Sequence, residues 1–155
     1  MPFLFTIMPT LDQLEKNLRF ALANIDKQAS VIVEQNKDFI LDLNREKQLF
    51  DKGINSDGKL LRPYRPFTVS LKRQKGEPFN RTTLFDKGDF YKGFDLLFRN
   101  NKISIFSRDS KSSDLQEKYG SNIFGLTPDN SKIYAERFNS ELTKYLKSTI
   151  YGRTN

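Results

Sequence analysis

The sequence contains no cysteine, no histidine and no tryptophan. Without cysteine, a disulfide framework and thiolate zinc sites are excluded, and without histidine the commonest general base and metal ligand are missing. No run of about 18 apolar residues is present that could span a bilayer. The opening MPFLFTIMP lacks the charged segment and the small-residue cleavage site of a secretory leader. We therefore expect a protein made in a cytoplasm, with no membrane partner, no cofactor and no bound metal.

The length and apolar content suit one domain. With 155 residues, of which 37% are hydrophobic, the chain can build one core but hardly two. We interpret residues 1–155 as a single domain with a long helix over 10–47, hairpins and a small basic helix over 48–110, and C-terminal helices over 111–150. The predicted class is α+β, with a small antiparallel sheet of about 3–4 strands.

A long amphipathic helix is predicted first. Thr10 and Gln13 form a capping box at its start. Apolar residues then recur every seven positions, at Leu11, Leu18, Ile25, Ile32 and Phe39. Unbroken to Lys47, this helix would measure about 55 Å, whereas a compact chain of this size is only about 40 Å across. It should therefore bend, break or protrude, with residues 34–38 weakest because asparagine and aspartate are poor helix formers.

A protruding amphipathic helix needs partner surface along its length, which favours self-assembly. A helix that packs wholly on its own domain fits the same apolar periodicity. The pattern alone therefore leaves both arrangements open.

Two hairpins and a small helix are predicted in the middle of the chain. Residues 55–58, Asn-Ser-Asp-Gly, form a turn signal between apolar residues, since glycine adopts positive φ without a Cβ clash. Pro66 suits the first turn of a basic helix through Lys75, and Gly76 should stop it. The runs GFDLLF and KISIFS, separated by Asn100-Asn101, predict the second hairpin.

Two helices should complete the chain. Ser112 or Ser113 can cap a helix that ends at Gly120. Residues 127–129, Thr-Pro-Asp, then match an N-cap, a first helical residue and an acid that suits a helix N-terminus. Gly152 limits this final helix, and no repeat, low-complexity tract or linker interrupts the elements.

Positive charge is concentrated in one stretch. The net charge is +7, and residues 1–50 carry six basic and seven acidic side chains, which sum to −1 and leave +8 for the remainder. Between residues 59 and 81, a single acid, Glu77, accompanies the basic residues Lys59, Arg62, Arg65, Lys72, Arg73, Lys75 and Arg81. This patch can attract phosphates or acidic protein surfaces, and a merely solvated loop and helix face explains it equally well.

The stretch RTTLFDKGDFYKGFDLLF, residues 81–98, allows two interpretations. In a metal-dependent nuclease, Asp86 and Asp89 would bind magnesium, with Asp95 or Asp109 as a further ligand. Their spacing matches no nuclease pattern, and 19 acids produce such a cluster by chance. Alternatively, Asp86 accepts amide hydrogen bonds in a turn, and Gly88 supplies positive φ. The core beneath would be filled by Phe85, Phe90, Tyr91 and Phe94.

The sequence contains none of the other common motifs for catalysis or ligand binding. The chain has no phosphate-binding loop, dinucleotide-binding glycine motif, nucleophile elbow or calcium loop. Aromatic residues interleaved with lysine could stack on single-stranded bases, which keeps a basic nucleic-acid-binding module as an alternative. However, 14 phenylalanines against six tyrosines are more typical of core filling.

Three short motifs follow one another in a distinctive order. They are the turn Asp86-Lys87-Gly88-Asp89-Phe90, the helix end Lys118-Tyr119-Gly120, and the corner Ile123-Phe124-Gly125-Leu126-Thr127 before the last helix. This order resembles the neck and tail-completion proteins of tailed bacteriophages, including the virion-morphogenesis and tail-terminator-like families. Those proteins carry a DTGxL turn before the sheet and a phenylalanine-leucine-glycine-leucine corner before the C-terminal helix. The resemblance covers roughly residues 48–146, with lysine in place of the usual threonine in the turn.

The resemblance implies a structural virion protein without an active site, a head-tail connector or tail terminator that joins portal and tail as a homo-oligomeric ring. Its partners would be further copies of itself, neighbouring portal, neck or tail proteins and, non-specifically, passing genomic DNA. After assembly in the host cytoplasm it would lie in the neck or tail of the virion. Phe124 should pack against the final helix or a neighbouring subunit. The implied structural residues are Asp86, Gly88, Phe90, Gly120, Phe124, Gly125 and Leu126.

Overall fold

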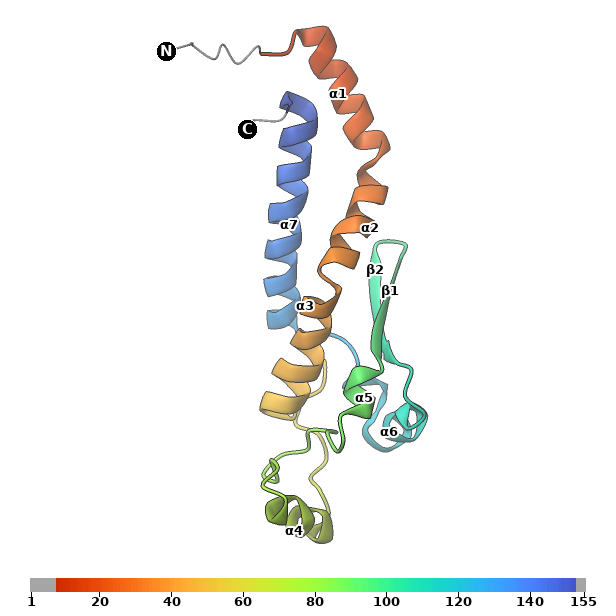
Figure 1. Ribbon diagram of the computed structural model, residues 1–155, viewed down its shortest axis with the longest axis vertical. Helices are drawn as coiled ribbons and strands as arrows, with labels where there is room; N and C mark the ends of the chain where they lie inside the picture. The colour runs from red at the N-terminus through yellow and green to blue at the C-terminus, as the bar shows by residue number, and fades with distance from the viewer. Residues whose placement is uncertain (1–7, 153–155) are drawn as a thin grey trace, which may run out of the picture. The chain divides into compact units, whose positions relative to one another are not determined.

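The computed structural model describes residues 8–152 (Figure 1). Most of the opening stretch analysed for a secretory leader, residues 1–7, lies outside the described residues. The described chain divides into two compact units, one made of residues 8–35 with 135–152 and the other of residues 36–134. Within residues 8–152, no helix combines the length and the apolar content needed to cross a bilayer.

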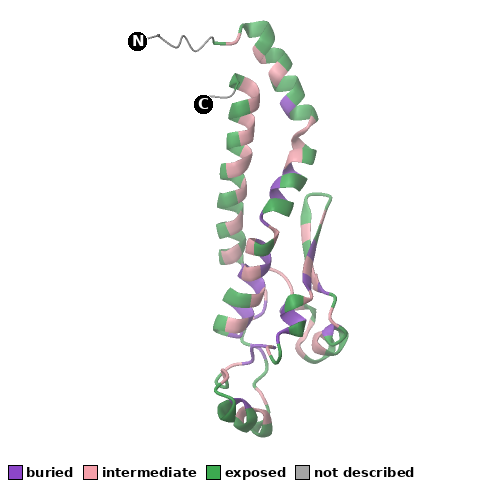
Figure 2. Cartoon of the chain, in the orientation of Figure 1, coloured by how far each residue is buried: buried purple, intermediate pink, exposed green. Residues whose placement is uncertain are grey.

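The first unit pairs its N-terminal helices with the last helix. Its elements are α1 (Leu11–Ala23), α2 (Ile25–Gln35) and most of α7 (Pro128–Tyr151), which returns beside them (Figure 1). Asn17 Nδ2 donates to Ile150 O at 2.9 Å and so ties α1 to the end of α7. The residues of α7 are all exposed or half-buried (Figure 2). This unit therefore leaves much of its helical surface uncovered.

The helical stretch predicted over 10–47 is interrupted, as its length led us to expect, and does not form one long helix. After α1 and α2 come α3 (Lys37–Asp42) and a π-helical segment, η1 (Leu43–Phe50). Asn24, the C-cap of α1, donates from its side-chain amide to Phe20 O at 2.9 Å and thereby competes with the backbone ladder. Asn36, inside the predicted weak segment, separates α2 from α3 with φ of −100°. The predicted start is confirmed, since Gln13 N donates to Thr10 Oγ1 at 3.2 Å.

The second unit carries a two-stranded antiparallel sheet, β1 (Phe94–Arg99) with β2 (Lys102–Ser107). Asn100 and Asn101 between them have φ of 50° and 58°, as the predicted turn requires. The α+β class is confirmed. The prediction of about 3–4 strands is wrong, because the first predicted hairpin forms only one bridge, between Ile54 and Leu60.

That first segment is a turn without strands. Asn55 Oδ1 accepts hydrogen bonds from the amides two and four residues further along, both at 3.0 Å. Gly58 has φ of 75°, in agreement with the predicted turn. The ladder cannot extend far beyond the bridge, because Pro63 has no amide proton to donate.

Two of the shorter helices, α4 (Pro66–Gln74) and α6 (Ser112–Tyr119), begin and end close to the predicted residues. The helical turn α5 (Asp89–Lys92) and the 3₁₀ turn η2 (Ser121–Ile123) were not predicted. Gly76 and Gly120 follow α4 and α6 with positive φ. Thr127 Oγ1 accepts from Asn130 N at 3.3 Å and caps α7 as predicted. The cap of α6 differs, since Ser112 is its first helical residue and the N-cap is Lys111.

The core of the second unit gathers side chains from α3, η1, α5 and β1 (Figure 2). Its buried apolar residues are Ile40, Leu41, Leu43, Leu49, Leu61, Leu84, Phe90, Tyr91, Phe94, Leu96 and Ile123. Residues that come from four separated stretches of the chain thus meet in one core, and this core supports the turn and corner motifs.

Candidate functional site

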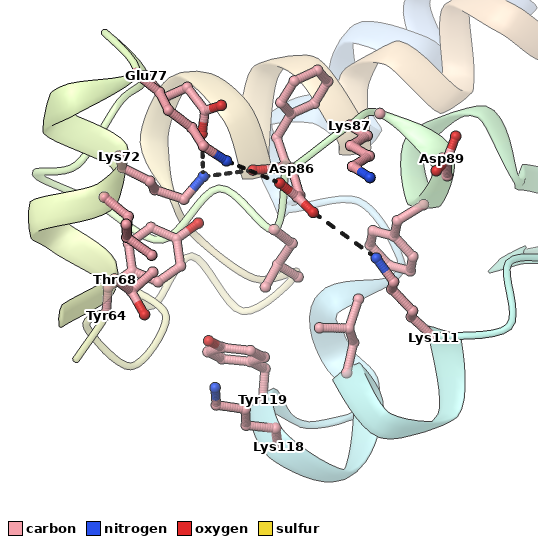
Figure 3. Close-up of a pocket in the computed structure, with 17 residues that line it drawn as sticks. Tyr64, Thr68, Lys72, Glu77, Asp86, Lys87, Asp89, Lys111, Lys118 and Tyr119 are labelled. Atoms are coloured by element: carbon pink, nitrogen blue, oxygen red, sulfur yellow. Dashed lines mark hydrogen bonds and ion pairs between the residues drawn. The ribbon is translucent and has the colours of Figure 1, made fainter.

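In the turn at residues 86–90, Gly88 has the predicted positive φ, but Asp86 does not have the predicted partners. Gly88 has φ of 89°, and a Cβ built there would lie 3.3 Å from the ring of Phe85. The expected amide hydrogen bonds to the Asp86 side chain do not occur among the described residues. Its carboxylate is instead 56% exposed and lies 4.0 Å from Nζ of both Lys75 and Lys111 (Figure 3). Gly88 is therefore structural, whereas Asp86 bridges two surface lysines.

Three of the four aromatic residues predicted to fill the core beneath this turn do so, whereas Phe85 is half-buried. Phe90, Tyr91 and Phe94 are all buried, and the Phe90 and Phe94 rings meet edge to face with centroids 5.1 Å apart. The Tyr91 hydroxyl donates to Thr83 O at 2.5 Å. Burial raises the pKa of Tyr91 well above its usual value, so the phenol stays protonated and acts as a donor inside the core.

A pocket of about 270 Å³ opens beside the turn, lined from α4 on one side and α6 on the other (Figure 3). Leu71, Leu84 and Leu115 contribute apolar wall. The charged lining consists of Lys72, Lys75, Lys87, Lys111 and Lys118 with Glu77, Asp86 and Asp89. Five cations and three anions give this lining a net charge of +2. We call it the lysine-rimmed pocket.

Lys72 does not belong to an exposed basic patch, contrary to the sequence-based expectation. It is 8% exposed, and its Nζ donates to Glu77 Oε2 at 2.8 Å and to Phe85 O at 2.7 Å. Arg81 is also engaged, since its Nε donates to Phe50 O at 2.7 Å. The other five predicted residues are exposed and form the basic patch used below: Lys59, Arg62, Arg65, Arg73 and Lys75.

The corner at residues 123–127 is held by two fully buried amide side chains of η1. Asn44 Nδ2 donates to Ile123 O at 3.0 Å, and Asn44 Oδ1 accepts from Gly125 N at 2.9 Å. Gln48 Nε2 donates to Gly125 O at 2.9 Å, and Gln48 Oε1 accepts from Thr127 N at 2.8 Å. Each amide therefore satisfies one donor and one acceptor of the corner backbone.

Sequence reasoning missed this pair of amides. No signal in the sequence distinguished them, because all five residues between Leu43 and Leu49 are polar and only Asn44 and Gln48 among them are fully buried. They lie in a π-helical segment, a conformation that is uncommon and recurs at functional positions. An all-polar run does not show which of its residues are buried, because their burial depends on hydrogen-bond partners that another segment supplies.

The corner residues themselves pack within the chain. Phe124 is half-buried and lies against the aromatic residues of the core, with its ring centroid 5.3 Å from that of Phe94. Gly125 has φ of 108°, and a Cβ there would lie 3.3 Å from Ser56 Cβ. Leu126 is half-buried. The glycine is thus required by both backbone conformation and close approach.

The acids considered as magnesium ligands do not gather. Within residues 8–152, no group of three or more carboxylates lies close enough to hold a metal. The Asp95 carboxylate instead accepts from Lys37 Nζ at 2.6 Å and from Arg108 Nε at 2.8 Å. The hydrogen bond from Lys37 is the main cause that lowers the pKa of Asp95 to about 2. Asp109 Oδ1 accepts from the amide of Lys111 at 2.9 Å.

Comparison with known proteins gives no relative from which a function could be transferred. No protein-family model matches the chain, and no curated protein or solved structure matches it. Function is therefore inferred from the residues and contacts of this chain alone.

Proposed function

We propose that this chain is a structural, non-enzymatic virion protein of a tailed phage, a neck or tail-completion subunit that joins portal and tail as part of a homo-oligomeric ring. The observation that carries the proposal is an uncovered apolar row on α1. Leu11, Leu18 and Leu22 lie on one helix face and are 84%, 45% and 57% exposed. An apolar row of this kind needs partner surface, which assembly would supply.

The second unit supports a structural role. Its buried amides hold the backbone of the corner, its aromatic rings fill the core, and Asp95 pairs with lysine and arginine. These groups therefore have structural uses that need no substrate. In a ring, each subunit would offer one surface to the next in a head-to-tail contact that closes on itself.

The content of purified particles tests this function. Mass spectrometry of density-purified virions should identify the chain, and antibody labelling should place it at the junction of head and tail. A host-cell protein carried through the same purification serves as the background control. Detection of the chain in the infected lysate but never in particles would contradict the proposal.

A basic nucleic-acid-binding module is the second candidate, because the five residues of the basic patch are exposed. In the ring, the same patch would meet passing DNA without reading its sequence. The purified chain should then bind duplex DNA weakly, independently of sequence, and with a steep decrease on addition of salt. Tight binding to one sequence at physiological salt, lost on Arg73→Gln alone, would make the nucleic-acid module the better proposal.

A further inference from the structure

We propose that the lysine-rimmed pocket receives the start of α1 from a second copy of this chain, with Leu11 inserted and the carboxylates of Asp12 and Glu15 at the rim. This inference rests on the proposed ring, since it names the contact through which neighbouring copies would join. It is derived from the size, the wall and the charge of the pocket.

The size and wall of the pocket suit a single large side chain. Its volume of about 270 Å³ lies below the roughly 300–1,000 Å³ typical of pockets for drug-sized ligands. Leu71 and Leu115 contribute apolar wall, and Leu71 is 40% exposed although it is apolar. An inserted leucine would cover this surface and remove it from water.

The net positive charge of the rim favours the binding of carboxylates. Lys72 and Glu77 already pair with each other at 2.8 Å, which leaves the exposed lysines Lys75, Lys87, Lys111 and Lys118 against Asp86 and Asp89. Four cations minus two anions leave an excess of two positive charges. Asp86 holds its two lysines only at 4.0 Å in exposed surroundings, where ion pairs are weak. Incoming carboxylates can therefore share these lysines.

The start of α1 fits that description better than the other exposed apolar segments. At 84%, Leu11 is the most exposed large apolar side chain of residues 8–152. Asp12 and Glu15 follow it within the first turn and a half of the helix, and both are exposed. Glu15 also pairs with Arg19 at 2.8 Å, but both side chains are more than half exposed, so the pair is easily exchanged.

Two other strongly exposed apolar residues, Leu60 at 76% and Phe67 at 74%, have basic neighbours. Leu60 follows Lys59, and Phe67 stands two residues after Arg65. A lysine rim would repel both segments. Charge complementarity therefore favours the start of α1, where Asp12 and Glu15 precede the first basic residue, Lys16, over these two segments.

This contact is heterologous, because the pocket and the α1 start are different surfaces of the same chain. Each copy would present one of each, so that association continues head to tail until the rotation closes the ring. The exposed start of the apolar row on α1 and the lysine rim thereby serve one interface.

A peptide tests the contact directly. A fluorescently labelled peptide of residues 8–23 should bind the purified full chain saturably, as measured by anisotropy, and added salt should weaken the binding. Lys75→Glu with Lys111→Glu should reduce the affinity by at least about tenfold, and so should Leu11→Ala in the peptide. The control chain Lys52→Glu with Lys102→Glu carries the same charge change on exposed residues outside the pocket and should bind nearly as the unaltered chain does.

Charge exchange between full chains provides a second measurement. In sedimentation velocity, Asp12→Lys with Glu15→Lys and the rim variant should each self-associate less than the unaltered chain, and their mixture should regain association. Lack of saturable peptide binding, or equal loss in the rim and control variants, would overturn the contact. If the chain is found in virions but the peptide does not bind, this contact is refuted and the proposed function is not. If the peptide binds but the chain is absent from virions, the proposed function is refuted.

Discussion

At the scale of single residues, a comparison of Gly88 with Gly58 distinguishes the cost of a Cβ at positive φ from the cost of a steric contact. Both have positive φ, 89° and 75°, but a Cβ at position 88 would meet the Phe85 ring at 3.3 Å, and a Cβ at position 58 would meet nothing within 4 Å. Gly88→Ala should therefore destabilise the fold by more than about 1 kcal/mol, and Gly58→Ala by less than Gly88→Ala. Urea unfolding of the two variants measures the difference.

The contacts of Asp86 in the same turn predict that magnesium does not change the stability of the fold. Addition of magnesium should leave the melting temperature of the unaltered chain unchanged, since Asp86 faces two lysines. A magnesium-dependent rise that Asp86→Asn abolishes would restore the metal site as an interpretation of this stretch.

Lys72 and Lys75 lie one turn apart and should respond differently to the same substitution. Lys72→Gln removes a buried cation from Glu77 and from the carbonyl of Phe85. It should cost about 3 kcal/mol, near the low end for a broken buried pair, because Glu77 keeps some contact with water. Lys75→Gln should change the free energy of unfolding by less than about 0.5 kcal/mol. Equal effects in urea unfolding would show that Lys72 contributes as a surface lysine does.

At the scale of elements, η1 and the corner depend on each other through Gln48. Gln48→Leu would leave Thr127 N and Gly125 O without their side-chain partner. This change should cost at least about 2 kcal/mol, because each buried group that loses its hydrogen bond is penalised. Gln74→Leu on exposed α4 is the matched control and should be nearly neutral. Hydrogen exchange should show faster exchange at the Thr127 amide in the first variant only.

The ion pairs of Asp95 on β1 with Lys37 and Arg108 should contribute less to stability at low pH. Because the folded pKa of Asp95 is lowered from 3.8 to about 2, its ionised form stabilises the fold fully above about pH 4, and this contribution is lost as the pH falls towards 2. Asp95→Asn should therefore be less stable than the unaltered chain at pH 6, and the gap should narrow between pH 4 and pH 2. Asp114→Asn, on exposed α6, is the control for a general loss of charge.

Elements bounded by local stereochemistry could be predicted from the sequence. Pro66, Pro128 and the Asn100-Asn101 turn each restrict their own backbone, and the structure has α4, α7 and the hairpin there. The π-helical segment and the break at Asn24 could not be predicted, because a single asparagine is tolerated in most helices.

Features of the site that depend on distant partners were also missed. Lys72 can be buried because its ammonium group donates a hydrogen bond to Phe85 O. Gln48 can be buried because Gly125, 77 residues later, accepts a hydrogen bond from its amide. Local periodicity contains no information about such partners. The predicted glycine turn and aromatic filling, by contrast, depend on neighbouring residues and are confirmed.

At the scale of the whole molecule, the uneven charge bears on the symmetry of assembly. Residues 1–50 sum to −1, and the remaining chain sums to +8. A contact between two identical basic surfaces would place like charges together, whereas a head-to-tail contact joins unlike surfaces. The charge distribution therefore favours the heterologous arrangement proposed above.

The division into two units has a consequence for biosynthesis. The second unit is one continuous stretch, residues 36–134, whereas the first combines residues from both sides of it. During translation α1 and α2 are made before the second unit, whereas α7, which packs beside them, is completed after it. The second unit can fold while α1 and α2 still lack their contacts with α7, a state that favours aggregation or chaperone binding. The order of synthesis thus makes the earliest helices of this chain the last to reach their native contacts.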